Sequence, residues 1–372
     1  MLRRAVPLAV IATALAGRAV LAAGPASPVA WQFAVAGDSR NCGDVVMPAI
    51  AAGAKQARAA FYWHLGDFRA FYKIDEDMAA AARVAGKELE VAGYLGGAWP
   101  DFIRNQIAPF DPIPFYLAIG NHELIGKSRA DYLAQFADWL EQEPIRRQRL
   151  ADDSSDHQLR TYNHWIVGGT DFIALDSASG DMFDDPQVSW LEKVIAADRA
   201  NPAVKSVVAG MHAALPHSLA CGHSMSDKPQ SDASGTRVYK DLLAFHKETG
   251  KPVYVLASHS HFYIANVFDS DYWNANGGVL PGWIIGTAGA NRYPLPEVPL
   301  KGEAIEYVYG YLLASVHEDG TIDFRFRKIE KSDIPASVVE RYSQPLVDQC
   351  FDGNRDLSKP KAVTCMNVEG CK

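Results

Sequence analysis

Two histidines separated by a single residue, His259 and His261, follow the apolar run VYVLAS late in the main body of the chain. Neutral imidazole is the commonest nitrogen ligand of metal ions in proteins, so the pair belongs either to a metal site or to an ordinary surface loop. Two histidines alone favour the surface loop. The other polar clusters of the chain have to decide between these interpretations.

Four further apolar runs also end in residues that can bind metal ions. The clusters after these runs are Gly37-Asp38-Ser39-Arg40-Asn41, Gly66-Asp67-Phe68-Arg69, Gly120-Asn121-His122-Glu123 and Met211-His212. Each cluster alone is weak evidence, because a Gly-Asp pair after a strand is usually a turn. Ligands of open α/β sheets bind beyond the carboxyl ends of the strands, so we expect all five clusters at one edge. Carboxylate, amide and imidazole donors together are typical of a two-metal site.

The order of these clusters resembles the motif order of the calcineurin-like metallophosphoesterases. The motifs are GDSR, GDF, GNHE, AGMHAALPH and SHSH in this chain, and the resemblance extends roughly over residues 32–328. It implies an α/β fold of four layers, with two packed mixed β-sheets flanked by helices. It also implies a hydrolase that cleaves phosphate esters with a metal-bound hydroxide. Phosphomonoesters are the favoured substrates, and phosphodiesters are the alternative.

The resemblance implies a site for two divalent or trivalent metal ions, with Asp67 as the bridge between them. The other ligands would be Asp38 and His261 for the first ion, and Asn121, His212 and His259 for the second. Zinc, manganese and iron all suit mixed nitrogen and oxygen donors, so we expect one of these metals or a mixed pair. His122 would stabilise the developing charge or protonate the leaving oxygen, and Glu123 would orient it.

Arg40 is the main departure from the family pattern, because this position usually holds a ligating histidine. A guanidinium has no lone pair to give to a metal, so the first ion loses a protein ligand or takes water or Asn41 instead. The alternatives are then a mononuclear esterase, or a degenerate-site protein that binds metal or phosphate with little turnover. Ser258 replaces a usual glycine, which is a milder change. Ala70 stands where the purple acid phosphatase variant has tyrosine, which argues against an iron–tyrosinate site.

Several residues beside the expected ligands are candidates for contacts with the substrate. They are Arg40, Arg69, Asn121 and His217. The guanidinium fork matches phosphate oxygens, so each arginine either clamps the phosphate or pairs with the adjacent ligand, Asp38 or Asp67. Arg40 is thereby also a candidate catalytic residue. His217 lies in the loop after the lone histidine of the fourth motif, and it is either a substrate contact or a solvent-exposed histidine.

Short apolar runs alternate with helical patterns along the body of the chain, which predicts an α/β sandwich. The predicted strands are 32–37, 60–66, 114–120, 163–168, 170–176, 204–210, 252–258 and 282–287. The predicted helices are 44–59, 128–141, 186–199 and 236–249, and the first three have Asp44, Ser128 and Asp185 as caps. The later runs 306–316 and 321–328 flank the turn sequence EDG, a hairpin signal that predicts mixed sheets.

The segment from 30 to 330 is predicted to be one domain with two insertions. Residues 68–111 are partly helical and follow a site-bearing strand, so we expect them to form a lid or wall. Residues 141–160 are strongly charged and end in a loop, and the tail at 331–372 is polar and loop-like. The tail holds three of the five cysteines. The other two, Cys42 and Cys221, are candidates to pair with each other after export.

The first 23 residues have the layout of a secretory signal peptide. A basic head precedes an apolar stretch at 5–17 that is too short to span a bilayer, and small residues follow it. We therefore expect export to the periplasm or the extracellular space. The body has no apolar run of about 20 residues, so no membrane span is expected in the mature chain. A net charge of −8 on 372 residues indicates no nucleic-acid surface.

Overall fold

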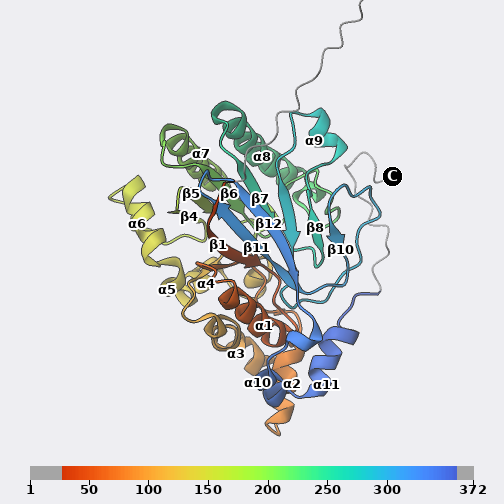
Figure 1. Cartoon of the computed structure of the whole chain (residues 1–372). Coiled ribbons are helices and arrows are strands. Elements are labelled where there is room, and N and C mark those ends of the chain that lie inside the picture. Colours follow the sequence, from red (N-terminus) through yellow and green to blue (C-terminus); the bar gives the residue numbers. More distant parts are fainter. Residues whose placement is uncertain (1–26, 358–372) are drawn as a thin grey trace, which may run out of the picture.

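Two β-sheets pack face to face in the part of the chain that the computed structural model describes, residues 27–357 (Figure 1). The five-stranded sheet has the order β12 (Ile322–Lys328), β11 (Gly310–His317), β1 (Val29–Ala36), β2 (Tyr62–His64) and β3 (Phe115–Leu117). The seven-stranded sheet has the order β10 (Ala304–Ile305), β8 (Tyr263–Ala265), β9 (Gly282–Ile285), β7 (Val253–Ala257), β6 (Ser206–Gly210), β5 (Thr170–Ala174) and β4 (Asn163–Val167).

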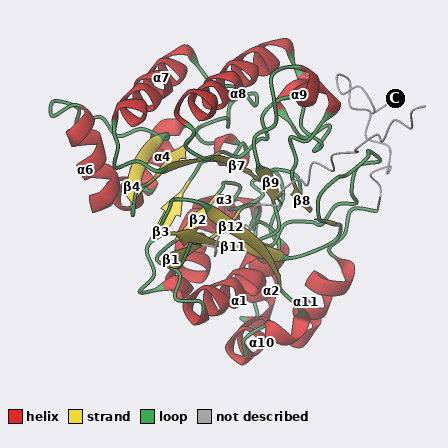
Figure 2. Cartoon of the chain, turned by 45° about the horizontal axis from the view of Figure 1, so that its top comes forward, coloured by secondary structure: helices red, strands yellow, loops and turns green. Residues whose placement is uncertain are grey.

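Helices cover the outer faces of both sheets, as Figure 2 shows. The larger sheet carries α7 (Asp185–Ala200), α8 (Pro229–Thr249) and the short α9 (Asp271–Ala275). On the side of the smaller sheet lie α1 (Gly43–Gln56), α10 (Ala336–Tyr342) and α11 (Gln344–Asp348). This arrangement confirms the predicted α/β sandwich of two mixed sheets between helices.

Each sheet combines a run of parallel strands with antiparallel strands. Strands β1, β2 and β3 run parallel, and so do β5, β6, β7 and β9. Strands β2, β3, β5, β6 and β7 are buried along their whole length, which explains why their sequences are nearly continuous apolar runs. Because parallel strands end at the same edge, the loops after them lie together.

Aromatic side chains fill the space between the sheets. Phe61 packs edge-on against Phe172 with ring centroids 5.1 Å apart, and Trp63 packs in the same way against Trp165 at 5.2 Å. Such pairs add about 0.5–1.5 kcal/mol to the free energy of burial. Gly210 ends β6 directly over the indole of Trp63, where a Cβ would lie 2.1 Å from the ring. The sheets therefore approach closely just beneath the loops that carry the predicted ligands.

The predicted elements are present with shifted ends, and the helix predicted at 236–249 begins earlier, as α8 at Pro229. Every predicted strand run overlaps an observed strand, and the predicted hairpin joins β11 to β12. Strands β8 and β10 are too short to be predicted from periodicity. The helix predicted at 128–141 is divided into α4 (Arg129–Gln135) and α5 (Ala137–Leu140), and Ser128 caps α4 as expected. The cap of α7 is Asp184 instead of Asp185, and Asp44 lies in the first turn of α1 instead of at its cap.

Residues 68–111 are partly helical as expected, whereas residues 141–160 and the tail are more helical than the sequence indicates. Residues 68–111 contain α2 (Glu76–Val84) and α3 (Val91–Phe102), and residues 141–160 contain α6 (Glu143–Asp152). The expectation of a loop-like tail is wrong for its described part, 331–357, which contains α10 and α11. These helices are short and are stabilised by packing against α1 and α2. Their isolated sequences therefore carry little helical signal.

A disulfide between Cys42 and Cys350 joins the start of α1 to the tail, across a sequence separation of 308 residues. The predicted pairing of Cys42 with Cys221 is therefore wrong, because pairing follows proximity in space and the tail folds back onto α1. The predicted signal peptide at 1–23 and the last two cysteines lie outside the described residues. Among residues 27–357, no helix is both long and apolar enough to cross a membrane.

Candidate metal centre

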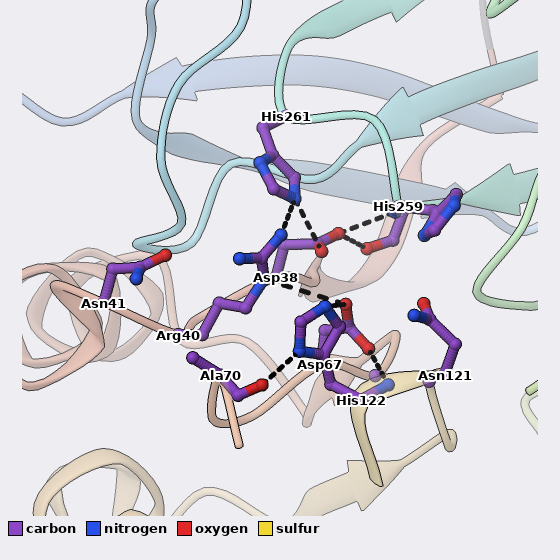
Figure 3. Close-up of polar contacts among 12 residues, drawn as sticks. Asp38, Arg40, Asn41, Asp67, Ala70, Asn121, His122, His259 and His261 are labelled. Carbon is purple, nitrogen blue, oxygen red and sulfur yellow. Dashed lines mark hydrogen bonds and ion pairs between the residues drawn. The ribbon is translucent and has the colours of Figure 1, made fainter. Parts of the chain in front are cut away.

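Loops from both sheets carry the predicted ligands to one shared edge, as Figure 3 shows. The loops after β1, β2 and β3 provide Asp38, Asp67 and Asn121, and the loops after β6 and β7 provide His212, His259 and His261. Each set of strands is parallel within its sheet, so the strand ends are neighbours. The two sets meet where the sheets face each other.

The backbone at three of these residues has a left-handed conformation. The φ angle is 58° at Asp38, 61° at Asp67 and 63° at His259. Such angles are uncommon for residues other than glycine, and they concentrate at functional sites. Gly120 stands at a close approach, since a Cβ there would lie 2.3 Å from Oδ1 of Asp67. Its lack of a side chain lets the third loop reach the carboxylate.

Asp67, Asn121, His212 and His259 form one compact group of donor atoms. Nε2 of His212 lies 3.3 Å from Oδ2 of Asp67, 3.0 Å from Oδ1 of Asn121 and 2.9 Å from Nδ1 of His259. One ligand atom from each of Asp67, His212 and His259 lies within 4.8 Å of the others. Metal–ligand bonds are about 2 Å long, so a single ion fits among these atoms.

The environment of this group fits a cation. Oδ2 of Asp67 is buried and accepts no hydrogen bond from any described residue. Nδ1 of His212 donates to the carbonyl oxygen of Leu65 at 2.9 Å, which leaves the lone pair of Nε2 directed into the group. Burial opposes charge on His212, but Asp67 and Asp38 raise its pKa to about 10. The carboxylates thus hold one positive charge here, which either a proton or a metal ion supplies.

The remaining predicted ligands, Asp38 and His261, lie beside Arg40. Oδ1 of Asp38 is 3.1 Å from Nε2 of His261, and Nη2 of Arg40 is 3.1 Å from the same nitrogen. Nε of Arg40 is 3.8 Å from Oδ2 of Asp67. Asn41 turns away, since its amide donates to Glu76 at 2.9 Å (Figure 3). The structure therefore gives no support to Asn41 as a replacement ligand.

The sequence of the chain matches no family model and no curated protein. Its structure is similar to that of a dimetal phosphatase from Danio rerio, with a TM-score of 0.51 and 12% identity over 81% of this chain and 97% of that chain. The chain has the calcineurin-like metallophosphoesterase fold. Lower TM-scores are found for PhoD (0.45, 13% identity, 87% of this chain and 77% of that chain) and for a protein assigned as a 5′-nucleotidase from Staphylococcus aureus (0.44, 14%, 86% and 58%).

His122 occupies the rim of the centre in this metallophosphoesterase fold. Its Nδ1 lies 2.6 Å from the carbonyl oxygen of Ala70 and donates to it, so Nε2 carries the free lone pair 3.5 Å from Oδ2 of Asp67. Burial lowers the pKa of the ring, and Asp67 opposes that shift. The ring of Tyr72 packs against it with centroids 5.3 Å apart. His122 can therefore exchange a proton at Nε2 next to the donor group.

Glu123 has a different role from the one expected. Its buried carboxylate accepts hydrogen bonds from the backbone N–H groups of Asp67, Phe68 and Gly120 at 2.8–2.9 Å. It thereby ties the loop after β2 to the loop after β3. Burial, followed by the charge of Asp67, raises the pKa of Glu123 to about 8. The carbonyl of Ala70 is the partner that orients His122, so Glu123 positions the backbone instead of the His122 ring.

The structure places the Arg69 side chain in a cluster of carboxylates. The side chain is fully buried, and its guanidinium pairs with Asp44, Asp75, Asp77 and Asp101. These carboxylates come from α1 and from the insertion at 68–111. Neither a phosphate clamp nor a salt bridge to a metal ligand describes this arrangement.

His217 is also enclosed in the structure. Its Nε2 lies 3.1 Å from Oδ1 of Asp232, and its ring stacks on Tyr272 with centroids 3.4 Å apart. It is therefore a buried ring and not a solvent-exposed histidine, and its contact with a substrate stays a prediction.

Two tyrosines near the centre belong to no sequence motif. The hydroxyl of Tyr72 accepts a hydrogen bond from Nη1 of Arg40 at 3.1 Å, and the Tyr72 side chain is 59% exposed. Tyr293 stacks on His261 with centroids 4.1 Å apart. Tyr72 comes from the segment at 68–111, so this segment contributes one residue beside Arg40, and its role as a lid or wall stays a prediction. The sequence gives only weak signals for these tyrosines. Tyr72 lies shortly after the GDF motif, and Tyr293 lies in the proline-rich loop at 291–301.

Proposed function

We propose that this chain is an exported, metal-dependent hydrolase of phosphate esters, with phosphomonoesters favoured over phosphodiesters. The observation that carries the proposal is Oδ2 of Asp67, a buried oxygen that accepts no hydrogen bond from the described residues and faces nitrogens of His212 and His259. A buried carboxylate oxygen without a hydrogen bond is costly, so a cation bound at this oxygen completes the site. The fold shared with a dimetal phosphatase supports the same conclusion.

The residues that would hold the ion are Asp67, Asn121, His212 and His259. Zinc, manganese and iron all suit this donor set. The bound ion would supply a water of lowered pKa for attack on phosphorus and would draw charge from the phosphoryl oxygens. The backbone contact of His212 with Leu65 keeps the ring in the orientation that such an ion needs.

Arg40 and His122 face the same position from the other side of Asp67 (Figure 3). Nη1 and Nη2 of Arg40 form a planar fork that matches two phosphoryl oxygens. Nε2 of His122 is the atom that exchanges a proton with the departing oxygen, because Nδ1 is held by Ala70. A negatively charged phosphate beside the ring opposes the effect of burial on its pKa and favours the protonated form.

The test is hydrolysis of p-nitrophenyl phosphate and of bis-p-nitrophenyl phosphate by the purified protein. Chelation is expected to remove metal and activity together, and Zn²⁺, Mn²⁺ or Fe²⁺ is expected to restore both. Asp67→Ala is expected to lower kcat/KM by a factor of about 10³ or more. Asp323→Ala, at an exposed aspartate of β12, is the matched control and leaves kcat/KM unchanged. Activity that survives Asp67→Ala places the reaction elsewhere.

Arg40 favours one alternative, a protein that binds metal or phosphate esters with little turnover. This alternative predicts tight binding of a phosphate ester without release of inorganic phosphate. Hydrolysis of either substrate in the assay above identifies the hydrolase, and binding without hydrolysis identifies the binding protein.

The Cys42–Cys350 disulfide supports the proposed export, because disulfides persist in oxidising compartments. Cell fractionation is expected to recover the protein from the periplasm or the medium, with an N-terminus near residue 23. Recovery of a full-length chain from the cytoplasm contradicts this part of the proposal.

A further inference from the structure

We infer that the guanidinium of Arg40 takes the place of the first metal ion, so that the chain binds one ion where a dimetal site holds two. The inference rests on the proposed function and specifies its metal content. The four donors around Asp67 and His212 would hold the single ion. The expected ligands of the first ion surround Arg40 instead.

Two acceptor atoms lie beside Arg40 at this position, Nε2 of His261 and Oδ1 of Asp38 (Figure 3). Nδ1 of His261 donates to the carbonyl oxygen of Asn291 at 2.6 Å, so its Nε2 is an acceptor. Oδ1 of Asp38 is also an acceptor and lies 3.1 Å from that nitrogen. Two acceptors at this distance repel each other unless a donor or a cation joins them. Nη2 of Arg40, at 3.1 Å from Nε2 of His261, provides a hydrogen atom to that nitrogen, and the guanidinium provides the positive charge.

Both departures from the family pattern act on this same half of the centre. Arg40 contacts His261 and lies near Asp67, as described above. The hydroxyl of Ser258 donates to Oδ2 of Asp38, which also accepts the backbone N–H of His259 at 2.6 Å. A glycine at 258 would leave that oxygen with one donor fewer. The two substitutions thus replace metal bonds at the first position with hydrogen bonds.

The side chain of Arg40 is held in place and is not free to withdraw. It is buried, with 5% of the residue exposed, and its Nη1 donates to the hydroxyl of Tyr72. The ring of Tyr293 covers His261 on the side of the loop at 291–301. An arginine stays protonated in proteins, so an ion at the first position would stand against a permanent positive charge in a buried site. That repulsion excludes a second ion.

The guanidinium of Arg40 can supply the positive charge for phosphate binding that the first metal ion would otherwise supply. In a two-metal site, the pair of ions clamps the phosphoryl group. Here the planar fork of Arg40 binds oxygens of that group, and its charge does not depend on metal supply. Asp67 then spans one metal ion and one guanidinium instead of two ions.

Metal analysis of the purified protein tests this inference directly. The wild-type chain is expected to bind about one ion per chain, and the Arg40→His/Ser258→Gly double variant about two. Arg325→His, at an exposed arginine of β12, is the matched control and stays at about one. With Mn²⁺, the wild type is expected to give the electron paramagnetic resonance spectrum of an isolated ion, and the double variant that of a coupled pair. Two ions in the wild-type chain, or none, overturn the inference.

Alanine variants of His259 and His261 give a second test, which does not depend on a variant that binds an additional ion. His261→Ala is expected to retain the ion, whereas His259→Ala is expected to lose it. Loss of an ion in His261→Ala shows that His261 is a ligand and overturns the inference. The inference and the proposed function fail separately. One bound ion without phosphate release contradicts the hydrolase alone, and hydrolysis with two bound ions contradicts the inference alone.

Discussion

Arg40 and Arg69 occupy the same place in two similar loops, each two residues after an aspartate that follows a parallel strand. The structure gives them opposite surroundings. Arg40 lies among acceptor atoms of the metal centre, and Arg69 is enclosed by four carboxylates. The comparison shows that an Asp-x-Arg spacing does not decide the role of the arginine. The charges supplied by other elements decide it.

The insertion at 68–111 is the source of this difference. It supplies Asp75, Asp77 and Asp101 to the guanidinium of Arg69, in addition to Asp44 of α1. The same insertion supplies Tyr72 to Arg40, a neutral partner that leaves the positive charge available. One insertion therefore fixes a structural arginine and an arginine directed at the centre.

The largest expected effect is on folding, from Arg69→Leu. The substitution leaves four carboxylates together in a buried region without their counter-charge. We expect the free energy of unfolding to fall by about 3–5 kcal/mol, measured by urea unfolding monitored by circular dichroism. Arg69→Lys keeps the charge without the fork and is expected to lose less. A loss below about 1 kcal/mol for Arg69→Leu means that these carboxylates do not depend on the arginine.

Arg40→Leu is expected to show the opposite pattern. We expect kcat/KM for p-nitrophenyl phosphate to fall about 10²–10³-fold, because the substitution removes charge stabilisation at the phosphoryl group. The free energy of unfolding in urea is expected to fall much less than for Arg69→Leu, since Arg40 loses contacts with only a few residues, namely Tyr72, His261 and Asp67. Arg40→Lys retains the charge without the planar fork and is expected to lie between the wild type and Arg40→Leu. Equal losses of stability for Arg40→Leu and Arg69→Leu remove the distinction between the two arginines.

His164 extends the comparison to a buried histidine that is structural. Its ring nitrogens lie 2.6 Å from Asp152 and 2.7 Å from Asp171. Burial opposes the charged form, but these carboxylates raise the pKa from 6.5 to about 10. The stabilisation is complete below the unfolded pKa and is lost as pH rises toward the folded pKa.

We therefore expect the free energy of unfolding to fall between pH 6.5 and about 10, by more in the wild type than in His164→Gln. The measurement is urea unfolding at several pH values in that window. Identical pH dependence in the two proteins indicates that His164 is neutral in the folded chain. The Gln side chain is a suitable control because it keeps an N–H donor group and does not titrate.

Tyr72→Phe is expected to have the smallest effect. It removes one hydrogen bond to Arg40 and leaves the partly exposed ring in place. A bond of this kind is worth about 0.5–1.5 kcal/mol, so we expect KM to rise only a few-fold, with kcat nearly unchanged. A large fall in kcat would give Tyr72 a role in the reaction beyond holding the arginine.

Much of the candidate centre is predictable because its candidate ligands follow strand ends in a known order. Asp38, Asp67 and Asn121 each come directly after an apolar run, and the structure places all three at one sheet edge. The partner of Cys42 is not predictable, since the tail reaches α1 only through its packing. The role of Glu123 as a tie between backbone loops is likewise invisible in the motif, because its partners are N–H groups common to every residue.

The sequence by itself determined the alternation of strands and helices and the kinds of donor atoms after each strand. Those features are local, since periodicity and residue type act over a few positions. Only the tertiary structure decided which acceptors each arginine meets, because electrostatic partners come from elements far away along the chain. The distance between Nη2 of Arg40 and Nε2 of His261 joins residues 221 positions apart, and no local pattern encodes it.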